Sequence, residues 1–182
     1  MEKLELLMNH AVLDRALTRI AHQILEKNPD LTHVGFVGMQ TRGVFLAQRI
    51  AGKINEMEHA SLQTGVLDAT LYRDDYRTSL KHPTVQITDI PFDLNGKDII
   101  LVDDVLFTGR TVRAALDALT DFGRPRTIQL AVLVDRGHRE LPIRADYVGK
   151  KTTTAKNQEV ALKVTECDDE DSLWLMKVKE AD

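Results

Sequence analysis

Residues 99–111 read Ile99-Ile100-Leu101-Val102-Asp103-Asp104-Val105-Leu106-Phe107-Thr108-Gly109-Arg110-Thr111. The first four are β-branched or aliphatic, which is typical of a strand buried on both faces of a parallel sheet. Further along the chain, apolar residues recur at helical spacing at Val112, Ala115, Leu116 and Leu119. We therefore predict a strand that passes through two carboxylates and a turn of small residues into a helix.

The turn at residues 108–111 is suited to a phosphate. At the amino end of a helix, free backbone N–H groups and the positive end of the helix dipole both favour an anion. Gly109 lets the main chain approach the anion closely, and the hydroxyls of Thr108 and Thr111 add donors. Asp103 and Asp104 would repel the same phosphate, so we expect them to bind ribose hydroxyls or a hard cation such as Mg²⁺.

This stretch resembles the motif with which type I phosphoribosyltransferases bind phosphoribosyl pyrophosphate. An apolar run, a carboxylate pair and a Thr-Gly turn follow one another in the same order. Acidic pairs also follow strands in response-regulator and phosphatase-like α/β domains, where they hold magnesium beside an acceptor group. Those sites do not need a Thr-Gly-x-Thr turn directly after the carboxylates, so the motif favours a phosphorylated sugar.

Composition limits the class of protein. The chain has 182 residues, of which 43% are hydrophobic, and we expect residues 1–182 to form one domain with a sizeable core. Because the net charge is −4, nucleic-acid binding would depend on a local basic patch. Cys167 has no partner for an internal disulfide, and no apolar run approaches the ~18 residues of a membrane span. With no long apolar core near the amino terminus, we expect a cytoplasmic protein with no membrane partner.

Hydrophobic periodicity predicts alternating helices and strands. The first helix ends near Asn28; its outer face is basic, and its inner face carries Leu13, Leu17, Ile20 and Ile24. We expect further strands at residues 34–38, 66–72, 127–134 and 145–148, and a second helix with its inner face at residues 44–54. This order implies an α/β fold with a mainly parallel central sheet flanked by helices. Alternation at residues 160–164 and 173–178 predicts a C-terminal antiparallel hairpin appended to that sheet.

Two further segments carry charges that suit an anion. Residues 38–43, which include Thr41 and Arg42, follow a strand and are expected beside the carboxylate pair, because parallel strands present their carboxyl ends at one edge. Arg42 suits a pyrophosphate, although an ordinary turn with a solvent-facing arginine has the same pattern. Arg73 opens a long polar stretch, residues 73–95, and would cover a pyrophosphate if this loop moves; a solvated run of charges is the alternative.

A longer block narrows the resemblance to one family. Residues 132–150 read Val-Leu-Val-Asp-Arg-Gly-His-Arg-Glu-Leu-Pro-Ile-Arg-Ala-Asp-Tyr-Val-Gly-Lys. Together with residues 16–22, 38–43, 72–75 and 99–111, this block resembles the bifunctional pyrimidine operon attenuation proteins and uracil phosphoribosyltransferases of bacteria. The similarity covers roughly residues 10–165, in order and with close spacing.

The resemblance implies a type I phosphoribosyltransferase fold and the conversion of uracil and phosphoribosyl pyrophosphate to UMP and pyrophosphate, with Mg²⁺ as cofactor. It also implies a regulator that senses UMP or UTP, binds a hairpin in the leader mRNA of a pyrimidine operon and promotes transcription termination. A homodimer or homotetramer is the assembly that the family suggests.

The implied roles fall on matching positions of this chain. Asp103 and Asp104 would hold the ribose and Mg²⁺, and Arg73 and Asp74 complete the catalytic set. The pyrophosphate would be bound by Thr41 and Arg42, and the ribose phosphate by Val105, Leu106, Phe107, Thr108, Gly109, Arg110 and Thr111. The base would be approached by Arg136 and by the main chain near Tyr147 and Val148. RNA contacts are expected from Thr18, Arg19, His22, Arg139, Arg144 and Lys150.

One segment and one single residue depart from the family pattern. Residues 151–155 read Lys151-Thr152-Thr153-Thr154-Ala155 and lack a proline that the family tends to have here, so the backbone is less restricted and the contacts of the base pocket are affected. Gln40 stands where some relatives have a lysine, which removes one contact to an anion.

Two enzyme-only alternatives stay open. A basic stripe on one helix is often an ordinary solvated face, in which case the chain would be a uracil phosphoribosyltransferase without RNA binding. A purine phosphoribosyltransferase would share the motif at residues 99–111 but not the block at residues 132–150. We predict the bifunctional regulator, because the two basic clusters supply the phosphate contacts and planar hydrogen-bonding groups that RNA requires.

Overall fold

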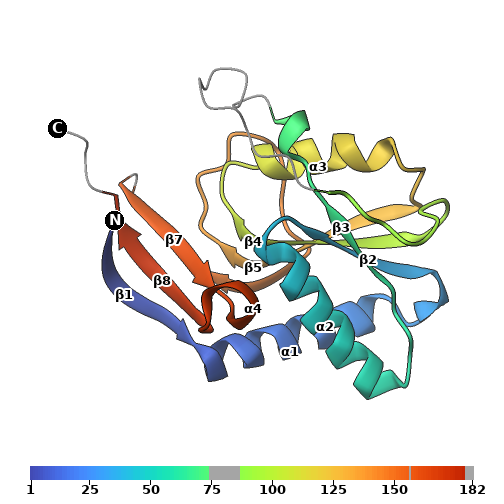
Figure 1. The fold of residues 1–182 in the computed structure, drawn as a ribbon, viewed down its shortest axis with the longest axis horizontal. Coiled ribbons are helices and arrows are strands. Elements are labelled where there is room, and N and C mark those ends of the chain that lie inside the picture. Colours follow the sequence, from blue (N-terminus) through green and yellow to red (C-terminus); the bar gives the residue numbers. More distant parts are fainter. Residues whose placement is uncertain (74–86, 156, 179–182) are drawn as a thin grey trace.

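A parallel five-stranded sheet forms the centre of the molecule (Figure 1). The computed structural model describes residues 1–73, 87–155 and 157–178. The sheet has the strand order β3 (Thr64–Leu67), β2 (Val34–Met39), β4 (Asp98–Leu106), β5 (Thr127–Asp135) and β6 (Tyr147–Lys151), and all its pairs are parallel. The predicted parallel sheet is therefore confirmed.

Helices cover both faces of this sheet, as the alternating pattern predicted. On one face, α1 (His10–Lys27) and α2 (Arg42–Glu58) bury their apolar sides against alternate residues of the strands, such as Phe36 and Ile100. On the other face, α3 (Arg110–Thr120) packs on Leu101 and its neighbours. No helix in the described part of the chain is long and apolar enough to cross a membrane.

The strand predicted at residues 66–72 is shorter than expected. β3 ends at Leu67, and residues 70–72 form a 3₁₀ turn instead. Oδ1 of Asp68 accepts a hydrogen bond from the backbone N–H of Thr70 (2.9 Å), a turn that aspartate favours and that ends the extended chain. A second 3₁₀ turn, Leu31–His33, leads from α1 into β2.

The C-terminal hairpin is present, but it belongs to a second sheet. β7 (Gln158–Lys163) and β8 (Ser172–Lys177) pair in antiparallel fashion, and β8 also pairs with β1 (Glu2–Asn9) at the amino terminus. The prediction that the hairpin extends the central sheet is wrong, because β8 pairs with β1 and these three strands form a sheet of their own. The short helix α4 (Thr165–Asp168) lies between β7 and β8 and faces α2 (Figure 1).

Candidate active site

The carboxyl end of β4 and the start of α3 line a cavity of about 310 Å³. Its walls are Arg73, Asp103 and the whole segment from residue 105 to residue 112. Gly109, which precedes α3, has φ of +94°, a left-handed conformation that favours glycine. The amino terminus of α3 therefore lies at the cavity, where its dipole and free N–H groups favour an anion. The structure brings together the residues predicted to bind the ribose phosphate.

The carboxylate pair lies within β4 and not after it, because the strand continues to Leu106. Asp103 is buried and Asp104 is half-buried. Oδ1 of Asp103 accepts the backbone N–H of Asp104 (2.9 Å), and Oδ1 of Asp104 accepts that of Val105 (2.7 Å). Burial raises the pKa of both carboxyl groups, and the charge of Asp104 raises the pKa of Asp103 further. Ionising both carboxyl groups therefore costs free energy unless a nearby cation offsets their negative charge.

These two carboxylates suit Mg²⁺. Among the described residues, no group of three or more His, Cys, Asp or Glu side chains could hold a metal by itself. Mg²⁺ is usually bound through one or two carboxylates together with water and substrate phosphates. The donor set of Asp103 and Asp104 therefore fits an ion that shares its coordination sphere with a phosphorylated substrate.

The turn after β2 lies beside the carboxylate pair. Gly38 in β2 pairs with Val102 in β4, and Gly43 at the start of α2 packs against β4. A Cβ at Gly43 would lie 2.6 Å from the carbonyl oxygen of Val102, so only glycine permits this approach. The close packing holds Thr41 and Arg42 next to Asp103 and Asp104, as the sequence predicted.

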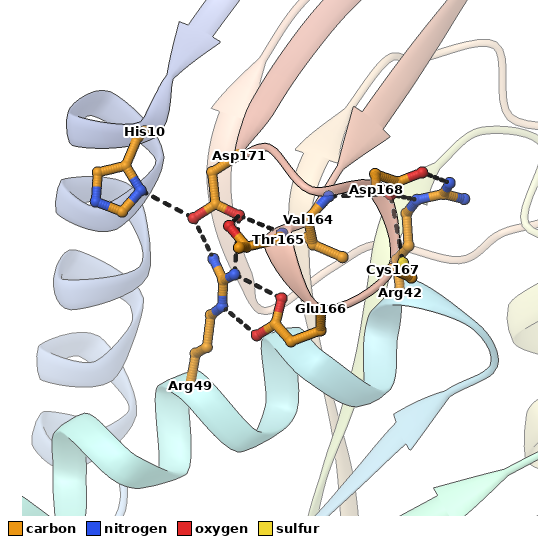
Figure 2. A network of polar contacts seen from close by, with 9 residues as sticks. All are labelled: His10, Arg42, Arg49, Val164, Thr165, Glu166, Cys167, Asp168 and Asp171. Carbon is orange, nitrogen blue, oxygen red and sulfur yellow. Dashed lines mark hydrogen bonds and ion pairs between the residues drawn. The ribbon is translucent and has the colours of Figure 1, made fainter.

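Arg42 does not simply face solvent. Its Nε donates to Oδ2 of Asp168 (3.0 Å) and its Nη2 to Oδ1 of the same residue (2.8 Å), a bidentate pair between α2 and α4 (Figure 2). Arg42 is also close enough to Asp104 for its charge to lower the pKa of that carboxyl, against the larger effect of burial. Asp168 lies 126 residues from Arg42 in the sequence, and no local pattern indicates that it belongs to the site.

Arg73 lies in the cavity of the phosphate turn. Its Nη1 donates to Oγ1 of Thr111 (3.1 Å), and its charge lowers the pKa of Asp103, which burial raises. Arg73 is thus next to the predicted ribose-phosphate site, and its predicted role toward pyrophosphate stays a prediction. Asp74 and most of the long polar stretch, residues 74–86, lie outside the described residues.

The predicted base contact Arg136 is buried. Its Nε donates to Oγ1 of Thr154 (3.1 Å), its Nη2 donates to the carbonyl of Gln158 (2.6 Å), and its guanidinium lies 3.9 Å from the ring centroid of Phe107. Burial lowers the pKa of Arg136. Thr154 belongs to the segment that departs from the family pattern, so this segment contacts the predicted base site directly.

Tyr147 and Val148 direct their side chains to opposite faces of the sheet. The Tyr147 hydroxyl is buried and hydrogen-bonded to Gln129 and Asn28. Val148 pairs with Val132 and lines a different cavity, of about 820 Å³. The predicted contact involves the main chain at these positions and stays a prediction.

Comparison with known proteins identifies the family. The phosphoribosyl transferase domain model matches residues 4–169. The chain is 59% identical to Bifunctional protein PyrR from Thermus aquaticus, over 92% of this chain and 94% of that protein. It is 49% identical to Bifunctional protein PyrR from Listeria monocytogenes, over 99% of this chain and 100% of that protein. The chain belongs to the PyrR family of phosphoribosyltransferases.

Solved structures support the same fold. A hypoxanthine phosphoribosyltransferase from Staphylococcus aureus superposes with a TM-score of 0.70 at 20% identity, covering 98% of this chain and 94% of that one. At this identity the likeness concerns the fold alone. It confirms the predicted type I phosphoribosyltransferase architecture.

The first RNA-binding cluster predicted for this PyrR-family chain lies on α1. Arg19 and His22 are exposed, and Thr18 is half-buried with its hydroxyl donating to the carbonyl of Asp14 (2.9 Å). Arg19 also donates to the carbonyl of Gly149 in β6. Side chains alternate between the two faces of the sheet along β6, so Lys150 lies on the face of Val148 and not on the face that α1 covers.

The second cluster is divided in the structure. Arg144 is exposed and lines the 820 Å³ cavity together with Gln23 of α1, the neighbour of His22. Arg139 is instead held by other groups: its guanidinium donates to the carbonyls of Phe107 (2.6 Å) and Ile143 (3.0 Å) and pairs with Asp135 (2.6 Å). Arg144 therefore adjoins α1, Lys150 lies on the opposite face of β6, and Arg139 contacts the loop after β4.

Proposed function

We propose that this chain transfers a ribose 5-phosphate group from phosphoribosyl pyrophosphate to uracil, and that it also binds the leader mRNA of a pyrimidine operon in response to uridine nucleotides. The observation that carries the catalytic half is the cavity in which buried Asp103, the neighbour of half-buried Asp104, adjoins a helix amino terminus. The high identity to proteins named Bifunctional protein PyrR supports both halves.

The phosphate turn at residues 108–111 binds the 5-phosphate of the sugar, and the two carboxylates face its hydroxyls. Uracil N1 attacks the anomeric carbon, the bond to the pyrophosphate oxygen breaks, and the N1 proton leaves to solvent. The transition state carries positive charge on the ribose and growing negative charge on the pyrophosphate. Arg42 and Arg73 neutralise the leaving group, and the carboxylates stabilise the ribose.

Asp103 and Asp104 would hold Mg²⁺, which supplies positive charge to the departing pyrophosphate when bound. Burial of the pair favours this role, because two adjacent carboxylates in a low dielectric bind a cation strongly.

The regulatory half rests on the exposed polar face of α1. Arg19 and His22 offer a cation and a planar hydrogen-bonding ring to an RNA loop, and Arg144, which lines a cavity with Gln23 of α1, extends this surface. These residues and the phosphate cavity involve different elements, so a nucleotide and an RNA would bind the protein together.

The catalytic test supplies the purified protein with Mg²⁺, phosphoribosyl pyrophosphate and either uracil or hypoxanthine. We expect UMP to form much faster than the purine nucleotide. Faster turnover of hypoxanthine would establish the purine alternative and refute uracil as the substrate.

The regulatory test measures filter binding of a pyrimidine leader hairpin and of a scrambled RNA of equal length, with and without UMP. Preference for the hairpin, strengthened by UMP, is expected. Equal binding of the two RNAs would refute the regulatory half of the proposal, and the protein would then be an enzyme only. Light scattering of the same samples tests the homodimer or homotetramer that the family suggests.

A further inference from the structure

Two arginines of α2 form ion pairs with one acidic turn, residues 165–171, which joins β7 to β8 (Figure 2). Arg42 pairs side-on with Asp168 through Nε and Nη2. Arg49, about two helical turns further along α2, pairs side-on with Glu166 through the same two nitrogens (2.8 and 2.6 Å). The two pairs therefore have matching geometry but lie at different distances from the phosphate cavity.

Asp168 is itself held in place. Its Oδ2 accepts the backbone N–H of Val164 (3.1 Å) and the thiol of Cys167 (3.3 Å). The turn is closed by Asp171, whose Oδ1 accepts the backbone N–H of Thr165 (2.8 Å). Arg49 also contacts Asp171, which ties the whole turn to α2. Because these hydrogen bonds restrain the Asp168 carboxylate, that carboxylate can in turn restrain the Arg42 side chain that pairs with it.

The pairing leaves part of Arg42 for another anion. A guanidinium has five N–H donors, and Asp168 takes one from Nε and one from Nη2. The opposite edge of the planar group carries the Nη1 donors, which no residue in the described part of the chain accepts, and a bidentate pair fixes the plane in which they lie. Arg42 also lies close enough to Asp104 to affect it electrostatically, so its charge reaches the carboxylate pair.

We propose that Asp168 is a positioning residue that orients Arg42 for the pyrophosphate group of the substrate. This inference rests on the proposed function, in which Arg42 binds that group. Without Asp168, the long arginine side chain would sample several rotamers, and part of the binding energy for pyrophosphate would be used to order it.

Arg42 holds the pKa of Asp168 at about 2, well below the usual range. Asp168 is therefore ionised at any pH at which the enzyme is assayed, and its effect on Arg42 is constant. The proposed role predicts a change in affinity for pyrophosphate without a change in the shape of the pH profile.

The experiment compares Asp168→Asn with Glu166→Gln, which removes the matching carboxylate charge from Arg49. Affinity for inorganic pyrophosphate with Mg²⁺ is measured by titration calorimetry, and KM values for phosphoribosyl pyrophosphate and uracil by steady-state kinetics. We expect Asp168→Asn to weaken pyrophosphate binding and raise the KM for phosphoribosyl pyrophosphate about tenfold, with the KM for uracil unchanged. Glu166→Gln should leave all three values near those of the parent. Thermal unfolding reports the loss of stability in both variants.

A double-mutant cycle tests whether Asp168 acts through Arg42. In an Arg42→Gln background, Asp168→Asn should have no further effect on pyrophosphate affinity. Should Asp168→Asn fail to fold, Asp168→Glu keeps the charge at a different reach and is expected to give an intermediate loss.

Unchanged pyrophosphate affinity in Asp168→Asn, additive effects in the cycle, or a parent that does not bind pyrophosphate would each overturn the inference. A parent that binds pyrophosphate but does not use uracil would refute the proposed substrate and leave the role of Asp168 intact.

Discussion

At Asp103, burial and a neighbouring carboxylate act in the same direction. Both favour the neutral acid, and the pKa rises although Arg73 opposes them. The folded protein then binds a proton that the unfolded chain, with an aspartate pKa of about 3.9, has already released. The free energy of unfolding of the protein without Mg²⁺ or nucleotide must therefore fall as the pH rises from about 4 through the raised pKa.

Asp103→Asn should remove the part of this pH dependence that Asp103 contributes. Because asparagine has no charge to desolvate, we expect the variant to have a higher melting temperature than the parent at about pH 8 and a similar one at about pH 5. Turnover of uracil should fall about 10²–10³-fold, since a contact made in the transition state is lost. Melting curves and initial rates measure the two effects. A variant that is less stable than the parent at the higher pH, or fully active, would contradict this account.

His22 and Arg19 carry the predicted RNA surface of α1. His22→Ala should weaken binding of the leader hairpin by about 1 kcal/mol or more and leave uracil turnover unchanged, because its side chain is exposed and belongs to no cavity of the catalytic region. Arg19→Ala should reduce the slope of log affinity against log salt by about one unit if Arg19 binds a phosphate.

Arg124→Ala is the matched control for Arg19→Ala. Arg124 is also exposed but follows α3, away from α1. We expect it to leave the salt slope unchanged. An equal change in both variants would mean that net charge, and not a contact on α1, determines RNA affinity.

Among the elements, α2 depends most on a close approach to the sheet. Gly43→Ala would place a Cβ 2.6 Å from the carbonyl oxygen of Val102, so the start of α2 must shift away from β4. We expect a loss of about 1–3 kcal/mol in stability and a larger KM for phosphoribosyl pyrophosphate, because Arg42 moves with the helix. Chemical denaturation and steady-state kinetics measure these changes.

Gly52 provides a control in the same helix. A Cβ there meets no described residue within 4 Å, so Gly52→Ala should stabilise the protein by about 0.5–1 kcal/mol through its higher helix propensity and leave the KM unchanged. If Gly43→Ala behaved like Gly52→Ala, the tight contact would not determine the position of Arg42.

The sequence predicted those elements whose apolar residues repeat within a single segment. The inner face of α1 and the run from Ile99 to Val102 are examples, since burial on one or both faces imposes a regular pattern. β1 was missed because most of it is exposed, as Leu4 and Leu6 show, and its place depends on pairing with residues 172–177.

The same distinction applies to the site. The phosphate turn is contiguous, so its residues could be predicted together. The Arg42–Asp168 pair joins positions 126 residues apart, and nothing local in the sequence indicates it. The sequence around Arg139 gives no sign of its partners. In the structure its guanidinium donates hydrogen bonds to backbone carbonyls.

At the scale of the whole molecule, nucleotide and RNA binding are coupled if both halves of the proposed function hold. Linkage requires that any factor by which UMP strengthens RNA binding equals the factor by which RNA strengthens UMP binding. Titration of UMP with and without saturating hairpin measures one factor, and titration of RNA with and without UMP measures the other. Unequal factors would show that the measured complexes differ in composition.

The pairing of β1 with β8 also determines at what stage of synthesis the three-stranded sheet can form. A ribosome releases the strands of the central sheet before β7 and β8, and domains begin to fold from the amino terminus. β1 emerges before every strand of the central sheet, yet its partner strand emerges after all of them, and Asp168 reaches Arg42 only at the same late stage. A nascent chain that ends after β6 therefore carries every strand of the central sheet and its phosphate turn, but it leaves β1 unpaired and Arg42 without its carboxylate.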